Sequence, residues 1–177
     1  MMDDSRALEG ARASEADVAD EQASFEDFFG EEHARLFGAL CLVTGDRFEA
    51  EEIMQDAFLR MWERWDRVRW LDDPSAYLFR TAMNVFRNRY RRTALGLRKT
   101  LSLAPNDDAF STVEDRDVVV RALRDLAPTQ RAAVVLTGYV GLTSEEAGEM
   151  LGMRAGAVRT LATRARAAIR EKAGGLP

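Results

Sequence analysis

Arginines recur along the last helical stretch of the chain, on the side away from its apolar residues. Arg159, Arg166 and Arg170 share one face, whereas Val158 and Ala165 recur at helical spacing on another. A guanidinium is planar and permanently charged, so it suits phosphates and the edge of a guanine. This spacing predicts contacts with nucleic acid, and the alternative is a basic face that is simply solvated.

The residues before these arginines carry the signals of a helix-turn-helix. Thr143 can cap a helix, and Glu146 three residues later completes a capping box. Gly152 stands where that helix should end with a positive φ, and a second helix follows from about residue 154. Gly148 costs about 1 kcal/mol relative to alanine inside a helix, which a close helix–helix approach would offset. The pattern predicts that the second helix enters the major groove of DNA.

The charges of the chain are strongly segregated. Residues 1–24 carry seven acids and two arginines, which account for the whole net charge of −5. Residues 75–100 hold seven bases and no acid, and residues 154–177 hold six bases and one acid. The segments between them are acidic. Two basic segments separated in this way predict two contacts with nucleic acid, each on its own domain.

Several classes of protein are not expected from the composition. One cysteine, Cys41, and one histidine, His33, make neither a disulfide nor a usual zinc site. No run of eighteen apolar residues predicts a membrane span, and the acidic N-terminus is not a secretory signal. No phosphate-binding loop, paired carboxylates or activated nucleophile is evident. We therefore expect a cytoplasmic protein that is not an enzyme, has no cofactor and does not contact the membrane itself.

The periodicity predicts an all-α fold of two small helical domains joined by a flexible linker. Residues 1–23 are acidic and poor in large apolar groups, so we expect them to be disordered. Helices beginning at Ser24, Glu49 and Ser75 form the first domain, 24–95. Residues 96–115 form the linker. The second domain, 116–173, contains two helices, with Pro128 in the first turn of the second, and then the helix-turn-helix.

Four segments in this order resemble bacterial RNA polymerase sigma factors of the extracytoplasmic-function type. They are EAEEIMQDAFLRMWERW (49–65), DPSAYLFRTAMNVFRNRYRR (73–92), LAPTQRAAVVL (126–136) and the helix-turn-helix. The first two correspond to region 2 of that family and the last two to region 4. The resemblance implies a subunit that gives the polymerase promoter specificity, with region 2 at the −10 element and region 4 at the −35 element.

The resemblance also implies a surface for the polymerase β′ clamp helices on the helix from Glu49. Trp62 is the strongest candidate, because it lies beside the apolar face of that helix and not at its centre. Phe58, in contrast, also fits the core of the domain. The residues of this predicted surface are Asp56, Phe58, Leu59, Arg60, Trp62 and Glu63.

At the −10 element the polymerase must open DNA, so exposed bases need aromatic partners and the backbone needs positive charge. The family captures a flipped base in the loop before the third helix, here about residues 70–74. Tyr77 fits packing on the bundle better than DNA contact. The resemblance assigns to the −10 element Arg69, Trp70, Arg80, Asn84, Arg87, Asn88 and Arg91.

The second helix of the helix-turn-helix corresponds to the −35 reader, and Arg159 is its strongest base-contact candidate. The chain departs from the family pattern at Ala157, where threonine is usual, and at Arg154, which replaces a small residue or proline. These departures remove polar contacts. The residues assigned to the −35 element are Arg154, Ala155, Ala157, Arg159, Thr160 and Arg164.

The partners implied are promoter DNA and the polymerase core, through the β′ clamp helices and the β flap. By analogy with the family, an anti-sigma factor is a further possible partner. Two other hypotheses remain: a stand-alone helix-turn-helix regulator, which would be a dimer on a palindromic site, and a sigma-like interaction protein. Because the chain outside its acidic end is electrically neutral, we expect weak, salt-sensitive DNA binding in isolation.

Overall fold

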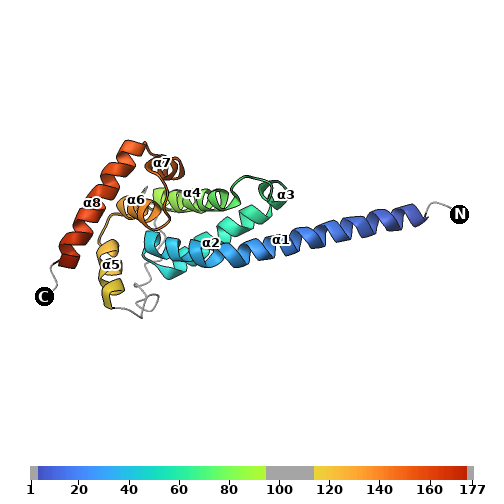
Figure 1. Ribbon diagram of the computed structural model, residues 1–177, viewed down its shortest axis with the longest axis horizontal. Helices are drawn as coiled ribbons and strands as arrows, with labels where there is room; N and C mark the ends of the chain where they lie inside the picture. Colours follow the sequence, from blue (N-terminus) through green and yellow to red (C-terminus); the bar gives the residue numbers. More distant parts are fainter. Residues whose placement is uncertain (1–3, 95–113, 175–177) are drawn as a thin grey trace.

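The computed structural model describes residues 4–94 and 114–174, and within them the side chains of 24–92 and 119–172. Every regular element in these ranges is an α-helix, and the predicted all-α fold is confirmed (Figure 1). The helices are α1 (Asp4–Thr44), α2 (Arg47–Trp62), α3 (Trp65–Val68), α4 (Pro74–Ala94), α5 (Glu114–Arg124), α6 (Pro128–Gly138), α7 (Ser144–Leu151) and α8 (Ala155–Gly174).

The start of α1 is the largest difference from the prediction. We expected residues 1–23 to be disordered and a helix to begin at Ser24, whereas α1 begins at Asp4. Residues 4–23 contain no proline and are rich in alanine, which has the highest helix propensity of all residues. In Figure 1 this part of α1 projects away from the packed helices. The alanine-rich composition therefore favours a helix here, although the segment is acidic and poor in large apolar residues.

The first unit consists of α2, α3, α4 and the C-terminal part of α1. Gly45, at φ 73°, turns the chain, and Asp46 caps α2 by accepting a hydrogen bond from the backbone N–H of Glu49 at 3.0 Å. Helix α2 ends at Trp62, and the four-residue α3 follows. Large side chains that are completely buried form the core of this unit: Leu36, Leu40, Ile53, Met61, Leu78 and Met83.

The second unit consists of α5 to α8. Pro128 is the first residue of α6, as predicted, and the helix-turn-helix is formed by α7 and α8. Leu136, Met150 and Val158 are completely buried between these helices. Most of the predicted linker, residues 95–113, lies outside the described residues.

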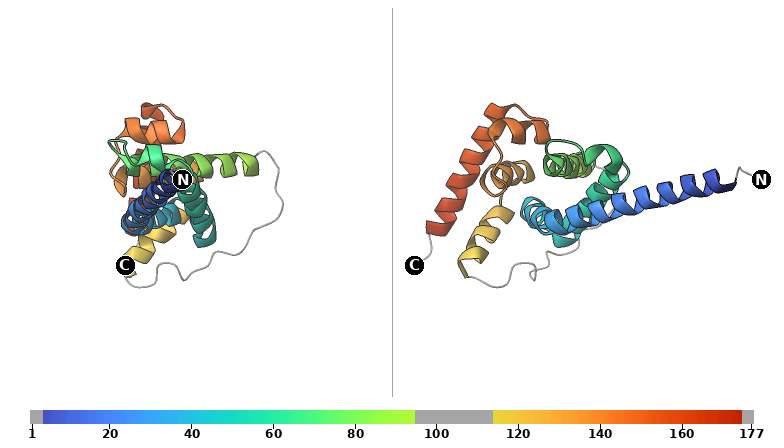
Figure 2. Two further views of the ribbon diagram at one scale, coloured as in Figure 1. Left: turned by 90° about the vertical axis from the view of Figure 1, so that its right-hand side faces the viewer. Right: turned by 45° about the vertical axis from the view of Figure 1, so that its right-hand side comes forward.

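The two units pack against each other. Helix α6 contacts α1, and α7 contacts α4, which Figure 2 shows as neighbouring helices. Buried apolar side chains of both units belong to one continuous core. The sequence predicts two domains joined only by a linker. It carries no local signal for their contact, because the contacting residues lie far apart along the chain.

Candidate nucleic-acid interface

The turn between α7 and α8 has the predicted geometry. The hydroxyl of Thr143 accepts a hydrogen bond from the backbone N–H of Glu146 at 3.2 Å, and the Glu146 carboxylate accepts from the backbone N–H of Thr143 at 2.7 Å. This second hydrogen bond lowers the pKa of Glu146. Gly152 ends α7 at φ 63°, and a Cβ on Gly148 would lie 2.8 Å from the carbonyl oxygen of Met153. The predicted capping box, positive φ and close approach are confirmed.

Helix α8 turns its basic face to solvent. Val158, Ala162 and Ala165 are buried against the rest of the unit. Arg159 reaches back to α7, where its Nη1 lies 3.0 Å from Oε1 of Glu145. Both side chains of this ion pair are more than half exposed, so the pair is weak and open to exchange for DNA. Of the residues assigned to the −35 element, only Ala155 is partly buried, whereas Arg154, Ala157, Arg159, Thr160 and Arg164 are exposed.

The loop before α4 presents an aromatic ring to solvent. Trp70 is 76% exposed, and the guanidinium of Arg69 lies 4.9 Å from the centre of its ring. Trp70 therefore does not pack into the bundle. Beside the loop lies a cavity of about 530 Å³ lined by Arg64, Leu71 and Tyr77, among others. A ring, positive charge and a cavity thus meet at the N-terminal end of α4.

Tyr77 forms part of the wall of this cavity. Its hydroxyl accepts a hydrogen bond from Nη1 of Arg64 at 3.2 Å, and its side chain is partly buried against the core. Packing on the bundle, as expected for this residue, is confirmed. The loop itself is fixed by Asp73, whose carboxylate accepts from the backbone N–H of Ala76 at 2.8 Å and so caps α4.

The assigned residues on α4 divide into two groups. Asn84, Asn88 and Arg91 are exposed. Arg80 and Arg87 point to α7: Nη2 of Arg80 lies 3.5 Å from Oε2 of Glu149, and Nη1 of Arg87 donates to the carbonyl oxygen of Met150 at 3.4 Å. The side chain of Arg80 remains 54% exposed, whereas Arg87 is partly buried. Arg87 also donates to Oδ1 of Asn84 at 3.4 Å. The structure therefore does not present the seven −10 residues as one open surface.

The predicted polymerase surface on α2 is only partly exposed. Leu59 is 59% exposed and Trp62 42%, and Arg60 and Glu63 are also exposed. Phe58 is only 5% exposed and packs edge-on or tilted against the rings of Phe25 and Phe29. The assignment of Phe58 to a docking surface is corrected, because a ring already buried in the core cannot bury itself against a partner.

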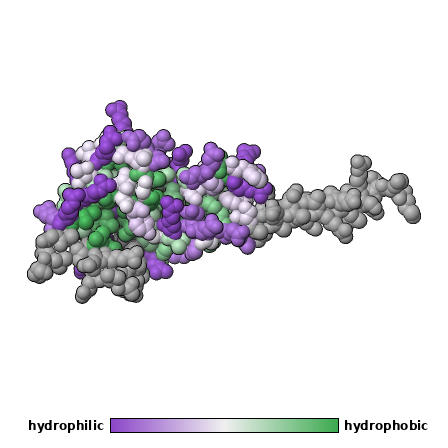
Figure 3. All heavy atoms as spheres, viewed as in Figure 1, coloured by the Kyte–Doolittle hydropathy of each residue, from purple (hydrophilic) through white to green (hydrophobic). Residues whose placement is uncertain are grey.

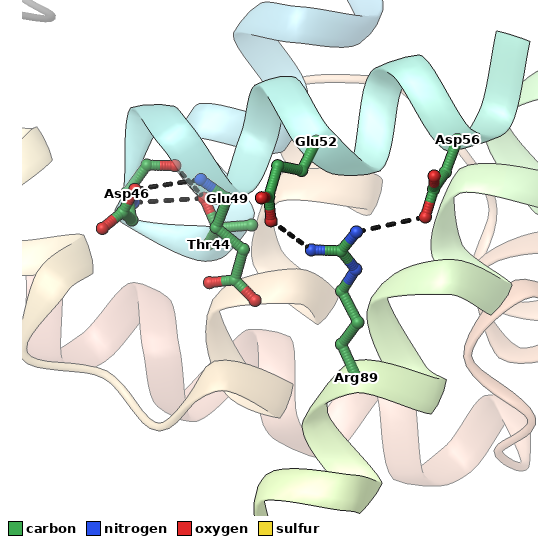
Figure 4. A network of polar contacts seen from close by, with 6 residues as sticks. All are labelled: Thr44, Asp46, Glu49, Glu52, Asp56 and Arg89. Carbon is green, nitrogen blue, oxygen red and sulfur yellow. Dashed lines mark hydrogen bonds and ion pairs between the residues drawn. The ribbon is translucent and has the colours of Figure 1, made fainter. Parts of the chain in front are cut away.

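Asp56 belongs to a charged network between α2 and α4 (Figure 4). Arg89 donates to Oε2 of Glu52 at 2.5 Å and to Oδ2 of Asp56 at 3.1 Å. Burial alone would lower the pKa of Arg89, but the two carboxylates outweigh it and raise that pKa. Arg89 and Arg131, described below, were not among the predicted site residues. Asp56 has a structural role in the first unit, in addition to any role in binding the polymerase.

In the residues that the structure describes, no group of His, Cys, Asp and Glu could hold a metal ion. No described helix is both long and apolar enough to cross a bilayer. Cys41 is buried, and burial raises its pKa to about 11, so it is a core thiol and not an activated nucleophile.

Comparison with known proteins identifies the two units. The family model of sigma-70 region 2 matches residues 28–95, and that of sigma-70 region 4 matches residues 116–169. The chain is 31% identical to the RNA polymerase sigma-E factor of Streptomyces coelicolor over 154 residues, which are 86% of this chain and 87% of that protein. It is 30% identical over 158 residues to the extracytoplasmic-function sigma factor SigM of Mycobacterium tuberculosis, covering 86% of this chain and 78% of that protein.

A solved structure with the same fold is the sigma factor RpoE of Bartonella quintana in complex with the anti-sigma factor NepR. Its TM-score is 0.67 at 22% identity, over 86% of this chain and 99% of that chain. The two helical regions in this order define a sigma-70 protein. The chain belongs to the extracytoplasmic-function group of RNA polymerase sigma factors, as the sequence predicted. It confers promoter specificity on RNA polymerase in transcription initiation.

Proposed function

We propose that this sigma factor opens and reads the −10 element with the loop before α4 and the exposed side of α4, and reads the −35 element with α8. The observation that carries the proposal is the exposure of Trp70, 76%, beside Arg69 and the adjacent cavity. An exposed ring can stack on a base once the strands separate.

The cavity beside Trp70 supports capture of a flipped base. Its volume of about 530 Å³ exceeds that of a nucleobase, and its wall carries Arg64 and Arg67 together with Glu63 and Asp66, so it offers hydrogen-bond donors and acceptors without a net charge. Extruding a base costs a few kcal/mol, which pocket contacts must offset. Asn88 and Arg91, exposed farther along α4, extend this surface toward the DNA backbone. The amide of Asn88 can donate to and accept from a base edge, whereas Arg91 suits a phosphate.

On α8, we assign base contact to Arg159 and phosphate contact to Arg154 and Arg164. Arg159 gives up only an exposed ion pair when it turns to DNA. Ala155 and Ala157 have no side-chain donor, and the hydroxyl of Thr160 already donates to the carbonyl oxygen of Gly156 at 2.9 Å. The arginines therefore carry most of the polar contacts available to this helix, which favours binding strength over fine sequence choice.

For the polymerase core we propose docking of Leu59 and Trp62 on the β′ clamp helices, flanked by Arg60 and Glu63. An apolar pair with charges of both signs beside it fits a helix-in-groove contact. Region 4 would contact the β flap. We further infer that the protein has no catalytic activity of its own and acts in the cytoplasm, where its polymerase works.

An anti-sigma factor is a further proposed partner, because the structurally similar RpoE was solved in complex with one. The chain offers a suitable apolar groove of about 290 Å³ between the two units, lined by Leu42, Val119, Tyr139 and Ile169 among others. Val119 is 43% and Tyr139 53% exposed. Figure 3 shows apolar side chains gathered on this face, between α5 and α8.

The assignments can be separated in one experiment on reconstituted holoenzyme. Trp70→Ala should reduce formation of the open complex, measured by permanganate reactivity, while core binding is unchanged. Since stacking on one base is worth about 1–3 kcal/mol, the reduction should be roughly 5-fold to 150-fold. Leu59→Arg should instead reduce core binding in a pull-down assay. Phe48→Ala is the matched control, because Phe48 is 53% exposed on α2 but outside the proposed surface.

Each assignment has its own contrary result. If Trp70→Ala formed open complexes at the wild-type level, the assignment of Trp70 to the −10 surface would be wrong. If Leu59→Arg bound the polymerase core as well as Phe48→Ala does, the proposed polymerase-binding surface on α2 would be wrong.

A further inference from the structure

A glutamate on α1 is joined to the start of α4, next to the cavity to which base capture is assigned above. Oε1 of Glu32 accepts a hydrogen bond from the hydroxyl of Ser75 at 2.8 Å, and the two residues are 43 apart in the chain. Ser75 is the second residue of α4, and Tyr77, which lines the cavity, follows two residues later. The hydrogen bond therefore ties the cavity wall to α1, none of whose described residues lines the cavity.

The carboxylate of Glu32 is nearly buried and has an incomplete set of partners. Its side chain is 14% exposed. Oε2 is buried and accepts no hydrogen bond from the described residues, and Nη1 of Arg35 lies 3.7 Å from it, at ion-pair distance. Removing such an oxygen from water costs free energy that an apolar residue of similar size would avoid. The contact with Ser75 is therefore explained better by what it positions than by stability.

Glu32 continues a stripe of α1 that packs on the same part of the first unit. Phe25 and Phe28 lie seven and four residues before it, on one side of the helix. The ring of each lies 5.2 Å from the ring of Trp65, the first residue of α3. Trp65 and Ser75 stand on either side of the loop before α4. Helix α1 thus holds this loop at both ends, by aromatic packing at α3 and by one hydrogen bond at α4.

The two attachments differ in kind. Trp65 is 5% exposed, so burial in the core fixes the α3 end of the loop. At the other end, residues 74–77 are only partly buried, and the first completely buried residue of α4 is Leu78. The hydrogen bond from Ser75 to Glu32 therefore supplies a directed contact where packing is weakest.

We propose that Glu32 is a positioning residue for capture of the flipped base. It acts through Ser75, which sets where the first turn of α4 and the ring of Tyr77 stand relative to α3. The proposal rests on the base capture proposed above. A loop held at one end occupies several positions, and the apparent affinity for a base falls with the fraction of the protein that can bind it. One hydrogen bond to a charged group is enough to change that fraction about tenfold.

The test uses holoenzyme reconstituted from polymerase core and the full-length chain. The probe is a labelled duplex that carries a promoter mapped with the wild-type holoenzyme, with its −10 region left unpaired so that strand opening does not contribute to binding. In a series of further probes, an abasic site replaces each base of the unpaired region in turn. The captured base is then found among the positions at which an abasic site lowers the affinity of the wild type.

The variants remove the hydrogen bond from either side. Glu32→Leu removes the acceptor, and Ser75→Ala removes the donor by the loss of a single oxygen, so it is expected to fold even if Glu32→Leu does not. Glu32→Gln keeps an acceptor oxygen for Ser75. Glu31→Leu, the same change at the exposed neighbouring position, is the matched control. Binding of each variant to the polymerase core is measured separately.

Glu32→Leu and Ser75→Ala should bind the intact probe about tenfold more weakly than the wild type does, with unchanged binding to the core. Glu32→Gln and Glu31→Leu should bind this probe as the wild type does. On the probe with an abasic site at the captured position, the wild type and all four variants should bind equally, because a displaced cavity wall then has no base to lose.

A tenfold loss that persisted on every abasic probe would make Glu32 an ordinary structural residue and would overturn the proposal. So would wild-type affinity of folded Glu32→Leu and Ser75→Ala for the intact probe. Failure of the base capture itself is visible in the wild type alone: if no abasic site lowered its affinity, the capture would be wrong, and the role of Glu32 with it.

Discussion

Gly148→Ala should destabilise the protein, although alanine is the better helix former. Gly148 lies inside α7, where alanine would gain about 1 kcal/mol of intrinsic helix propensity. A Cβ at this position, however, would lie 2.8 Å from the carbonyl oxygen of Met153 and 3.4 Å from the backbone nitrogen of Ala155. Both atoms belong to the backbone of the turn into α8, so they cannot move aside as the end of a flexible side chain can.

The size of the effect follows from these two opposed terms. Overpacking of a well-packed site typically costs about 1–3 kcal/mol, and a fixed backbone neighbour places this site at the upper end. The gain of about 1 kcal/mol in helix propensity offsets part of this cost of about 3 kcal/mol. The free energy of unfolding should therefore fall by about 2 kcal/mol. For a chain of this size the melting temperature should fall by about 4–8 °C.

Thermal and urea unfolding followed by circular dichroism measure this effect, and Gly138→Ala is the matched control. Gly138 is the last residue of α6, in the same region, and a Cβ there would meet nothing within 4 Å. The control should be as stable as the wild type or slightly more stable. If Gly148→Ala melted at or above the temperature of Gly138→Ala, the close approach of the turn to α7 would be refuted.

Three further predictions concern the cap of α7 and the buried thiol. Thr143→Ala should lower the free energy of unfolding by about 1 kcal/mol in urea titration, and Thr143→Ser should restore most of it; an unchanged midpoint would contradict the cap. Because the pKa of Glu146 is lower in the folded chain, its stabilising effect is complete above the unfolded pKa of about 4.3 and is lost as the pH falls through the folded value. The difference in stability between the wild type and Glu146→Gln should thus be seen at pH 7 and vanish in acid, and a difference that grows below pH 4 would contradict this sign. Cys41, with its pKa raised to about 11, should react with a thiol reagent at pH 7.5 only after unfolding, and rapid labelling of the native chain would disprove its burial.

The helix-turn-helix could be predicted from the sequence because its determinants are local. The capping box joins Thr143 to Glu146, three residues away, and the positive φ of Gly152 is a property of the residue itself. The same holds for Pro128 at the start of α6. Exposure on a single helix could be predicted in part. The sequence places Trp62 beside the apolar face of α2 and Phe58 where it also fits the core, and the structure has them 42% and 5% exposed.

The contact between the regions could not be predicted, because it depends on residues distant in the chain. Arg131, which is 7% exposed, donates a hydrogen bond to the carbonyl oxygen of Val43, 88 residues before it. Arg80 and Glu149 are 69 residues apart. Nothing in the neighbourhood of Arg131 distinguishes it from the solvated arginines of this arginine-rich chain. The signal that marks it is burial of a cation, which exists only once the two regions have packed.

The measurement that tests the account most directly is run-off transcription by core polymerase on genomic fragments, with and without this protein. We predict transcripts with discrete start sites that appear only with the sigma factor and are lost with Trp70→Ala and strongly reduced with Arg159→Ala. Phe48→Ala should transcribe as the wild type does. Binding to the core without any promoter-specific transcript would contradict the account and would favour a sigma-like interaction protein instead.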